Sequence, residues 1–364
     1  MKDYEKYMKK CIKLALEADG KTSPNPLVGA VVLDKNGKEI STGYHKAYGK
    51  PHAEADALNK LGDEARGGTL IINLEPCCHW GKTPPCADLV IKKGIKKLVI
   101  AMKDPNPLVA GQGIEKCKKA GIEVFEGILH DEAVELNEVF IKNMTKKATF
   151  VAIKTATTLD GKIATHSGDS KWITSEKSRR EVHKIRNRYD AILTTSSTVI
   201  KDNPSMKCSM KGGKNPARIV LDRELRTDFS SKIYESSGEK IYVVVDENLD
   251  WKGLTQIPAH INIIKCPTYN LKLDLNVLFK KLFELNIMSV LVEAGGKLNG
   301  ELVSLGLADK IYQFVAPRVL ADGHGKNAFE GRNVDKINNT LNFNIQSVAY
   351  FKPDVLIIYK EAAE

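Results

Sequence analysis

EPCCHWGKTPPC, residues 75–86, gathers three cysteines and one histidine within ten consecutive positions, 77–86. The chain holds seven cysteines, an odd number that a complete disulfide framework does not explain. Its first twenty residues place apolar side chains at helical spacing between lysines and acids, which predicts an amphipathic surface helix and not a signal peptide. No apolar run approaches the length of a membrane span. We therefore expect a cytoplasmic protein, in which thiols stay reduced and clustered cysteines serve a purpose other than disulfides.

One histidine and two cysteines of this region have the pattern of a catalytic zinc site. His52 precedes a predicted helix, and Cys77 and Cys86 each follow a proline at a predicted helix start. An imidazole and two thiolates give zinc three protein ligands and leave the fourth position for water. Glu54 is then placed to take a proton from that water and pass it to a leaving amine. Together these residues follow the His-x-Glu…Pro-Cys pattern of zinc deaminases.

The spacing of the cysteines leaves other interpretations open. Eight residues separate Cys77 from Cys86, where zinc deaminases usually have two. In one alternative the cysteines are free and buried beside a surface histidine. In another they form a closed structural site with Cys78 or His79 as the fourth ligand. Glu54 is in both cases only an acid favoured by the positive end of a helix dipole.

Residues 1–146 alternate between strands and helices, which predicts a first domain with three α/β/α layers. Asn36-Gly37 is a hairpin turn signal between the first two strands. The predicted strands are 28–33, 39–45, 69–74, 97–101 and 122–127. The predicted helices are 53–61, 87–94, 113–120 and a charged connector at 131–147.

A second series of strands and helices predicts an α/β domain over residues 147–364. The predicted strands are 150–156, 189–194, 217–222, 240–245, 261–265, 288–294, 310–316 and 355–359. The predicted helices are 175–188, which begins with Ser175 as its cap, 274–286 and 297–306.

Charged and glycine residues of this domain suggest a binding cleft. Lys154 lies late in an apolar strand, so it either faces a cleft, a counter-ion or a phosphate, or extends its ammonium to solvent. Glu293 ends another apolar strand, and Gly295-Gly296 then opens a helix whose backbone N–H groups favour an anion. A tight strand-to-helix connection explains the glycines equally well. No GxGxxG motif with a later acid is present, so a Rossmann dinucleotide fold is not predicted.

The net charge of +10 is compatible with an anionic partner. Lysines are spread along the whole chain, and no segment combines a dense basic run with interleaved aromatic residues, as a nucleic-acid surface would. A small phosphorylated substrate fits the positive charge equally well.

Four segments of the first domain resemble the deaminase half of the bifunctional deaminase–reductase family of riboflavin biosynthesis. They are NPLVGAVV (25–32), HAE (52–54), EPCCHWGKTPPCA (75–87) and DPNPLVAGQGI (104–114). In that family the longer spacing between the zinc cysteines is normal. The resemblance implies that His52, Cys77 and Cys86 bind zinc, that Glu54 is catalytic, and that Cys78 and His79 lie outside the metal site. The residues that it implies around the pyrimidine and ribose phosphate are Asn25, His45, Lys82 and Asn106.

The second domain resembles the reductase half of the same family, which has a dihydrofolate-reductase-like fold and uses NADPH. The segments are KTATTLDGKIA (154–164), GDSKWITSE (168–176), DNP (202–204), VLD (220–222) and VEAGGKLNGEL (292–302). The cofactor contacts that it implies are Ala156, Trp172, Thr198, Asp202, Gly295 and Gly296. The substrate contacts that it implies are Ser170, Arg186, Met206 and Glu293, and we expect Lys154 to orient the substrate with them. Arg186 otherwise only offsets a helix dipole.

One position departs from the family pattern. The segment after Asp-x-Pro usually carries an arginine that holds the substrate phosphate, and this chain has Ser209 there. Lys207, Lys211 or Lys214 is expected to supply the charge, although lysine lacks the bidentate fork of arginine.

The sequence therefore predicts an enzyme of riboflavin synthesis with two sites. Zinc-dependent hydrolysis deaminates 2,5-diamino-6-ribosylamino-4(3H)-pyrimidinone 5′-phosphate, and NADPH then reduces the ribosyl group to ribityl. We expect a small phosphorylated pyrimidine as substrate, no nucleic-acid or membrane partner, and assembly into a homo-oligomer. The alternatives are a tRNA or nucleic-acid base deaminase with a C-terminal RNA-binding module, a non-catalytic zinc scaffold, and a deaminase with a decayed reductase half.

Overall fold

The computed structural model describes residues 2–80, 84–107, 109–250 and 256–362. The chain divides into two compact units, Met1–Lys147 and Ala148–Glu364. Each unit has its own sheet and its own cluster of buried apolar side chains. Within the described residues, no helix combines the length and apolar character that crossing a bilayer requires.

The first unit is built on a five-stranded sheet of order β2-β1-β3-β4-β5. β1 pairs antiparallel with both β2 and β3, whereas β3, β4 and β5 run parallel to their neighbours. The turn at 34–38 joins β1 to β2 with Gly37 at φ 84°, as the Asn36-Gly37 pair predicts. The strands are β1 (Gly29–Leu33), β2 (Glu39–Tyr44), β3 (Thr69–Leu74), β4 (Lys97–Met102) and β5 (Glu123–Phe125).

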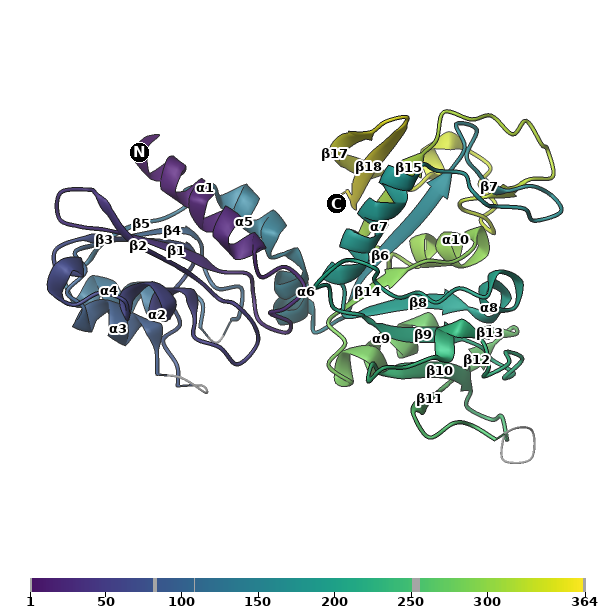
Figure 1. Cartoon of the computed structure of the whole chain (residues 1–364), viewed down its shortest axis with the longest axis horizontal. Helices are drawn as coiled ribbons and strands as arrows, with labels where there is room; N and C mark the ends of the chain where they lie inside the picture. Colours follow the sequence, from purple (N-terminus) through teal and green to yellow (C-terminus); the bar gives the residue numbers. More distant parts are fainter. Residues whose placement is uncertain (1, 81–83, 108, 251–255, 363–364) are drawn as a thin grey trace. The chain divides into compact units, whose positions relative to one another are not determined.

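Helices cover both faces of this sheet, which confirms the three-layer α/β/α prediction (Figure 1). α1 (Lys2–Leu16) contacts β1 and β3, and α5 (His130–Leu136) contacts α1 and β4 on the same face. On the other face, α2 (Ala53–Leu58) contacts β1 and β2, and α3 (Cys86–Lys92) lies between α2 and α4 (Gln112–Lys119).

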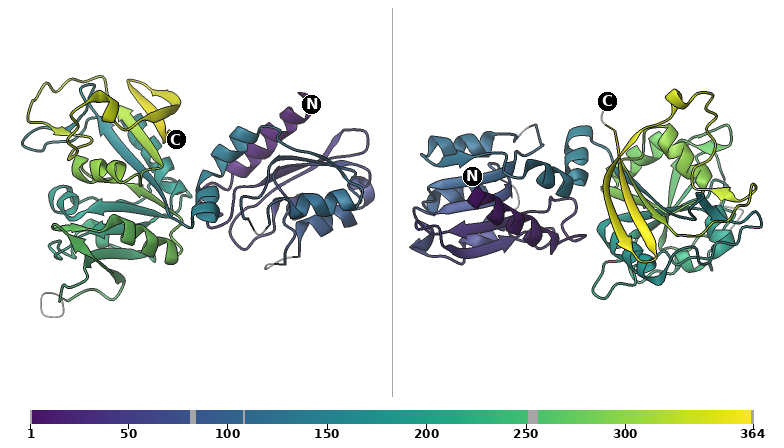
Figure 2. Two further views of the ribbon diagram at one scale, coloured as in Figure 1. Left: turned by 180° about the vertical axis from the view of Figure 1, so that it is seen from behind. Right: turned by 90° about the horizontal axis from the view of Figure 1, so that it is seen from above.

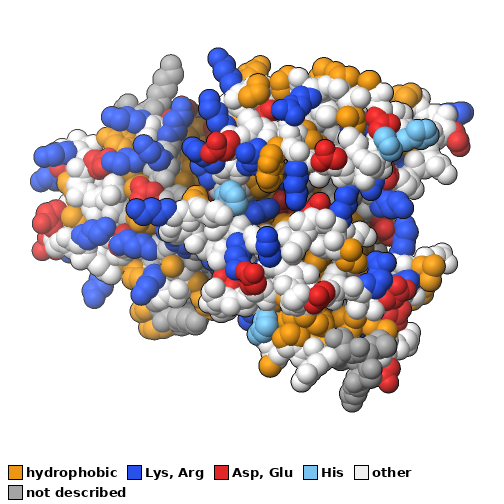
Figure 3. Space-filling model, turned by 45° about the vertical axis from the view of Figure 1, so that its right-hand side comes forward, with side chains coloured by type: hydrophobic (Ala, Val, Ile, Leu, Met, Phe, Trp, Pro, Cys, Tyr) orange, Lys and Arg blue, Asp and Glu red, His pale blue; other side chains and the backbone are white. Residues whose placement is uncertain are grey.

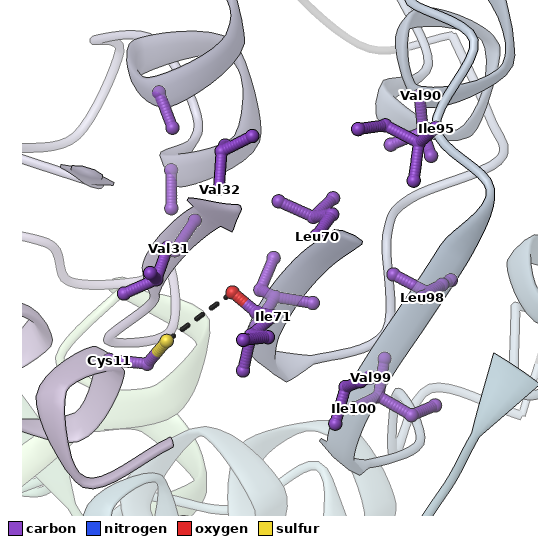
Figure 4. Close-up of a cluster of buried hydrophobic side chains, with 14 of the residues drawn as sticks. Cys11, Val31, Val32, Leu70, Ile71, Val90, Ile95, Leu98, Val99 and Ile100 are labelled. Atoms are coloured by element: carbon purple, nitrogen blue, oxygen red, sulfur yellow. Dashed lines mark hydrogen bonds between the residues drawn. The ribbon is translucent and has the colours of Figure 1, made fainter. Parts of the chain in front are cut away.

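The first helix packs through the apolar stripe that its sequence predicts. Met8, Cys11 and Ala15 share one side of α1 and are fully buried. Figure 4 shows Cys11 beside Val31 and Ile71, where its thiol donates a hydrogen bond to the Ile71 carbonyl at 3.3 Å. Burial raises the pKa of this thiol, so Cys11 acts as a small apolar core residue.

The second unit is built on a nine-stranded sheet of order β11-β10-β9-β8-β14-β6-β15-β18-β17. The strands from β11 to β15 run parallel, and β18 and β17 add an antiparallel edge. The strands are β6 (Phe150–Thr157), β8 (Ala191–Thr195), β9 (Ala217–Leu221), β10 (Ile241–Asp246), β11 (Ile261–Cys266), β14 (Ser289–Val292), β15 (Lys310–Val315), β17 (Phe343–Phe351) and β18 (Asp354–Glu361). Because β14 lies between β8 and β6, the carboxyl ends of these three parallel strands meet at one edge of the sheet.

The two faces of this sheet carry different helices (Figure 2). α9 (Leu275–Glu284) and α10 (Gly296–Ser304) bury apolar side chains against one face, in a cluster that includes Ile153 of β6. Lys154, the next residue, points to the opposite face because side chains alternate along a strand. α7 (Glu176–Arg188) covers that face, and Ser175 caps it by accepting a hydrogen bond from the Ser178 N–H.

Three features differ from the sequence predictions. The helix predicted over 131–147 is divided into α5 and α6 (Glu138–Lys146), because the Asn137 side chain binds both the N–H and the carbonyl of Leu27. The strand predicted over 288–294 ends at Val292, which places Glu293 beyond the sheet. Short or irregular elements lacked a periodic signal: α8 (Ser196–Asp202), β7 (Lys162–Ala164), β12 (Thr268–Tyr269), β13 (Lys272–Leu273), β16 (Lys326–Asn327), β17 and the 3₁₀ turns at Asp63–Ala65, Lys232–Tyr234 and Ile337–Asn339.

Candidate functional site

A histidine and two cysteines converge in the first unit from three separate segments. His52 precedes α2, Cys77 follows β3, and Cys86 is the first residue of α3. Their ligand atoms all lie within 4.8 Å of one another. The His52 Nδ1 lies 3.6 Å from the Cys77 Sγ and 3.4 Å from the Cys86 Sγ. This is the set of one nitrogen and two sulfurs that the His-x-Glu…Pro-Cys pattern of the sequence predicts for zinc.

The charges of these groups suit a metal ion. Hydrogen bonds from the Cys86 thiol and from His52 lower the pKa of the Cys77 thiol to about 4, against an opposing effect of burial. The same sulfur–sulfur hydrogen bond, together with burial, raises the pKa of Cys86. The hydrogen bond to Cys77 raises the pKa of His52. The lowered pKa favours a thiolate at Cys77, and metal binding would displace the remaining protons of the cluster.

The neighbouring cysteine and histidine do not complete a four-ligand site. The Cys78 thiol donates instead to the Gln112 side chain, at 3.7 Å. His79 is exposed. Among the described residues, the cluster contains His52, Cys77 and Cys86 alone, which leaves one tetrahedral position for solvent or substrate.

Glu54 is buried against this cluster, with 3% of its surface exposed. Burial and, to a lesser extent, the nearby charge of Cys77 raise the pKa of its carboxyl to about 7. The Cys86 thiol hydrogen-bonds to the same carboxyl. A carboxyl with a pKa near neutrality can both accept and return a proton, which is what general acid–base catalysis requires.

Two of the predicted substrate residues form a chain of hydrogen bonds beside His52. The Asn25 amide lies 3.2 Å from the His45 Nε2, and the His45 Nδ1 lies 3.0 Å from the Pro51 carbonyl. This network places the ring proton on Nδ1, and burial lowers the pKa of His45, so its imidazole is neutral. The His45 and His52 rings meet edge to face, with centroids 5.6 Å apart.

The other two predicted substrate residues of this unit lie in loops. Asn106 is half-buried, and its backbone N–H donates to the Asp104 side chain at 2.9 Å. Lys82 lies outside the described residues. Glu75, a buried acid two residues before Cys77, was not among the predicted site residues; its one local signal is an acid directly after a largely apolar strand, which is fully buried.

The second unit contains a cavity of about 1680 Å³ at the carboxyl ends of β6, β14, β8 and β9. All of the residues predicted for the reductase site line it: Lys154, Ala156, Ser170, Trp172, Arg186, Thr198, Asp202, Met206, Glu293, Gly295 and Gly296. They come from the ends of β6 and β14, from the loop before α7, from α7 and α8, from the segment after α8, and from the start of α10. The cavity exceeds the usual size of a pocket for one small ligand, so a dinucleotide and a second molecule can share it.

A group of three charged side chains forms one wall of this cavity. Glu293 accepts from the Arg186 Nε at 2.6 Å, from the Arg186 Nη2 at 3.0 Å and from the Lys154 Nζ at 3.2 Å. Burial opposes ionisation of Glu293, but Arg186 and Lys154 hold the pKa of this carboxyl far below its ordinary value. Arg186 therefore does more than offset the dipole of α7, and Lys154 has both the cleft and the counter-ion expected for it.

The surroundings of Ser209 do not contain the phosphate-binding lysine that the sequence analysis expected. Its backbone N–H donates to the His183 Nδ1 at 3.2 Å, and His183 lines the cavity. Lys207 pairs with Glu235 at 3.2 Å, and Lys214 with Asp190 at 3.8 Å. The described lining of the cavity includes neither these two lysines nor Lys211, so the expectation that one of them reaches a phosphate there is not supported. Instead Arg179, His183 and Arg186, at helical spacing on α7, face the cavity.

The two glycines before α10 have different surroundings. Gly295 is the N-cap of α10, and a Cβ there would meet nothing within 4 Å. A Cβ on Gly296 would lie 2.2 Å from the Asn327 carbonyl oxygen. Gly296 is thus required by close packing, while Gly295 leaves open space at the positive end of a helix.

Known proteins resemble both units. Residues 1–102 match the family model "Cytidine and deoxycytidylate deaminase zinc-binding region", and residues 149–357 match "RibD C-terminal domain". The riboflavin biosynthesis protein RibD of Aquifex aeolicus is 41% identical over 97% of this chain and 97% of its own length. That of Escherichia coli is 36% identical over 97% and 98%. A crystal structure of a diaminohydroxyphosphoribosylaminopyrimidine deaminase/5-amino-6-(5-phosphoribosylamino)uracil reductase from Thermotoga maritima has a TM-score of 0.87 and 40% identity, with 99% of each chain covered.

Fold and site together define a zinc-dependent deaminase of the cytidine deaminase type joined to a reductase unit with a dihydrofolate-reductase-like fold. The predicted fold class is thereby confirmed. The chain belongs to the RibD family of riboflavin biosynthesis proteins. It is a bifunctional deaminase and reductase that uses zinc and NADPH, as its sequence predicts.

The residues present fit both groups. An imidazole and two thiolates at mutual ligand distance, with a low pKa on one sulfur, are the donors that zinc prefers. His52, Cys77 and Cys86 would hold it. In the second unit, the open helix N-terminus at Gly295 and the cationic lining of the cavity suit the phosphates of NADPH.

Proposed function

We propose that the chain carries out two consecutive reactions on one phosphorylated pyrimidine. Residues 1–146 deaminate 2,5-diamino-6-ribosylamino-4(3H)-pyrimidinone 5′-phosphate, and residues 147–364 reduce the ribosyl group of the product to ribityl. The observation that carries this proposal is the three-ligand cluster of His52, Cys77 and Cys86 with Glu54 buried against it. The Thermotoga maritima relative, named for both activities, supports the same pair of reactions.

Glu54 moves the proton in the first reaction. Zinc, when bound, acts as a Lewis acid that brings the pKa of its water towards about 7. Glu54 takes a proton from the attacking water and delivers it to the amino nitrogen, so that the water oxygen replaces ammonia on the ring carbon. Asn25 and the neutral His45 orient the pyrimidine beside His52. Asn106 and Lys82 contact the ribose phosphate.

The residues of the second site position the substrate and the cofactor and do not themselves react. NADPH supplies a hydride, which adds to C1 of the opened ribose in its imine form while the nitrogen gains a proton. Lys154, Arg186 and Glu293 orient the ribosyl chain as one charged group. Ser170 and Met206 complete the substrate contacts. The proposed cofactor contacts are Ala156, Trp172, Thr198, Asp202, Gly295 and Gly296.

The experiment is one incubation with two readouts. Purified protein receives the diaminopyrimidinone phosphate, and ammonia release and then NADPH oxidation are measured. Glu54→Gln should reduce ammonia release by at least about a thousandfold, because the amide cannot transfer the proton, and should spare NADPH oxidation on pre-deaminated substrate. Glu64→Gln, an exposed glutamate of the same unit, is the matched control and should leave both activities unchanged. Loss of both activities in Glu54→Gln would contradict two separate sites.

The surface does not favour the nucleic-acid alternative. On the face drawn in Figure 3, lysines and arginines lie interleaved with acids rather than in one basic tract. Exposed lysines of both units are paired with acids, for example Lys46 with Asp56 and Lys272 with Glu301. A polynucleotide surface would instead concentrate unpaired cations along a groove with aromatic side chains for stacking.

Assembly and location complete the proposal. We propose a homo-oligomer, supported by the edge strand β17, whose Ile345, Val348 and Tyr350 expose 62%, 50% and 76% of their surface. A cytoplasmic location is supported by the cysteines, all seven of which are free thiols.

A further inference from the structure

A single buried carboxylate joins the metal-binding segment to the loop after β4 and to the first residues of α4. Glu75 lies two residues before Cys77 and exposes 3% of its surface. Its Oε2 accepts from the backbone N–H groups of Asp104 at 3.1 Å and Gly111 at 2.9 Å. Its Oε1 accepts from those of Gly113 at 2.9 Å and Ile114 at 3.2 Å. Four backbone donors that lie 29 to 39 residues after Glu75 in the sequence thus converge on its side chain.

The helix that follows this loop depends on these hydrogen bonds. The first N–H groups of an α-helix have no partner within the helix, and an N-cap side chain usually accepts them. The N-cap of α4 is Gly111, which has no side chain and makes no cap hydrogen bond. Glu75 supplies the missing acceptor from another segment, and its negative charge suits the positive end of the helix.

The same segments are also in direct contact. The Glu75 N–H donates to the carbonyl of Met102 at 3.0 Å, and Met102 is the last residue of β4 before the loop. A Cβ on Gly113 would lie 2.0 Å from the Pro76 carbonyl oxygen, so α4 packs against the residue that precedes Cys77. On the far side of Cys77, Cys78 donates to Gln112. Residues on both sides of Cys77 therefore contact the two ends of the loop that carries Asn106: the end of β4 and the start of α4.

We propose that Glu75 is a positioning residue of the deaminase: it sets the place of the loop that begins at Asp104, and hence of Asn106, and of the start of α4, relative to the metal ligand Cys77. This inference rests on the proposed function, in which Asn106 contacts the ribose phosphate. Among the described residues, the side-chain hydrogen bonds of Glu75 go to the four backbone N–H groups and not to His52, Cys77 or Cys86. It therefore acts through substrate binding and not through the proton transfer of Glu54.

The chemistry of the carboxylate makes the proposal testable. Its two oxygens accept two hydrogen bonds each, whereas the amide of glutamine has one accepting oxygen and one NH₂ donor. In Glu75→Gln, two of the four backbone N–H groups would therefore face a donor in a buried site. Each hydrogen bond to a charged group typically contributes enough to change an equilibrium about tenfold or more. Glu75→Asp keeps the charge and shortens the reach.

The test compares full-length Glu75→Gln with wild type and with Glu115→Gln, an acid of α4 outside this network. We expect Glu75→Gln to bind zinc with unchanged stoichiometry and to raise KM for deamination by about tenfold or more, with kcat within about threefold. Hydrogen exchange should accelerate at the amides of Asp104, Gly111, Gly113 and Ile114. NADPH oxidation on pre-deaminated substrate should not change, and Glu115→Gln should behave as wild type.

The remaining outcomes contradict either the positioning role of Glu75 or the proposed function, and they distinguish between the two. Unchanged KM together with unchanged exchange at the four amides would show that Glu75 does not hold the loop. Loss of zinc, or a fall of kcat by about tenfold or more with unchanged KM, would instead give Glu75 a role in the metal site. If Glu75→Gln does not fold, Glu75→Asp decides: partial recovery of KM supports positioning, and failure to fold assigns it to stability alone. If wild type releases no ammonia, the proposed function fails, while the exchange measurement still tests the contact.

Discussion

At the scale of residues, three ionised side chains, those of Glu293, Arg186 and Lys154, meet inside the second unit. Glu293 is 7% exposed on its side chain, Arg186 14% and Lys154 18%. Taking these charges out of water costs free energy, which the mutual attraction offsets only while all three partners are present. The group leaves one net positive charge on the cavity wall, which suits a phosphorylated substrate.

Removing the central carboxylate should therefore destabilise the protein. Glu293→Gln leaves two buried cations without a counter-ion, and we expect the free energy of unfolding of this unit to fall by about 3–5 kcal/mol at pH 7 in urea denaturation. Because the folded-state pKa of Glu293 is lowered, its contribution is present above the unfolded-state pKa of about 4.3 and is lost as the pH falls below it. The difference between variant and wild type should shrink below pH 4.

The control is a surface pair of the same unit. Glu301 pairs with Lys272 at 3.3 Å, and the lysine side chain is 65% exposed. Glu301→Gln should change the free energy of unfolding by no more than about 1 kcal/mol. An equally small effect of Glu293→Gln would mean that water enters this wall of the cavity.

At the scale of elements, the start of α10 combines tight packing with an open end. Gly296 and Gly300 share one side of the helix, and their backbone approaches the 327–330 segment so closely that a Cβ would meet carbonyl oxygens at 2.2 and 1.9 Å. Gly295, one residue earlier, adopts φ −81° and faces open space. Adjacent glycines thus serve different purposes, which the sequence motif alone does not distinguish.

A pair of alanine variants separates these purposes. Gly296→Ala should lower the free energy of unfolding by about 1–3 kcal/mol, because the Asn327 carbonyl must move to admit the methyl group. Gly295→Ala fits its backbone conformation and should leave stability unchanged within about 0.5 kcal/mol. Fluorescence titration with NADPH should show weaker binding for Gly295→Ala if the cofactor approaches this amide closely. Equal stability losses in both variants would contradict the distinction.

At the scale of the whole molecule, the chain carries two sites in two compact units with separate cores. The metal cluster lies wholly within the first unit, and the cavity with its charged group lies wholly within the second. Loss of one site should therefore leave the other active.

Metal removal tests this independence. Treatment with a chelator should abolish ammonia release and spare NADPH oxidation on pre-deaminated substrate, and added Zn²⁺ should restore the first activity. Cys86→Ser should behave like the chelated protein in metal analysis. Cys78→Ser is the matched control and should keep its metal, because the Cys78 thiol lies outside the ligand cluster. A fall of both activities on chelation would show that the second unit depends on the metal.

Local patterns predicted a large part of the fold. The stripe of α1, the turn between β1 and β2 and the cap of α7 each depend on residues within one or two helical turns of each other. The division between α5 and α6 was not predictable in this way, because Asn137 is held by Leu27, 110 residues earlier. The hydrogen bond of the Ser209 N–H was also not predictable, since its acceptor, His183, is 26 residues away on α7.

The sequence by itself determined which chemistry is possible: one imidazole, two thiols and a glutamate at these positions specify the zinc-type site, because donor atoms and their proton affinities belong to the residue types. Only the tertiary structure decided which distant groups meet. The insertion of β14 between β8 and β6 brings Glu293 to Lys154, 139 residues away. The approach of the start of α4 and of Asp104 to the 75–76 segment gives Glu75 its four donors. Such contacts depend on strand order and helix packing, which no short stretch of sequence contains.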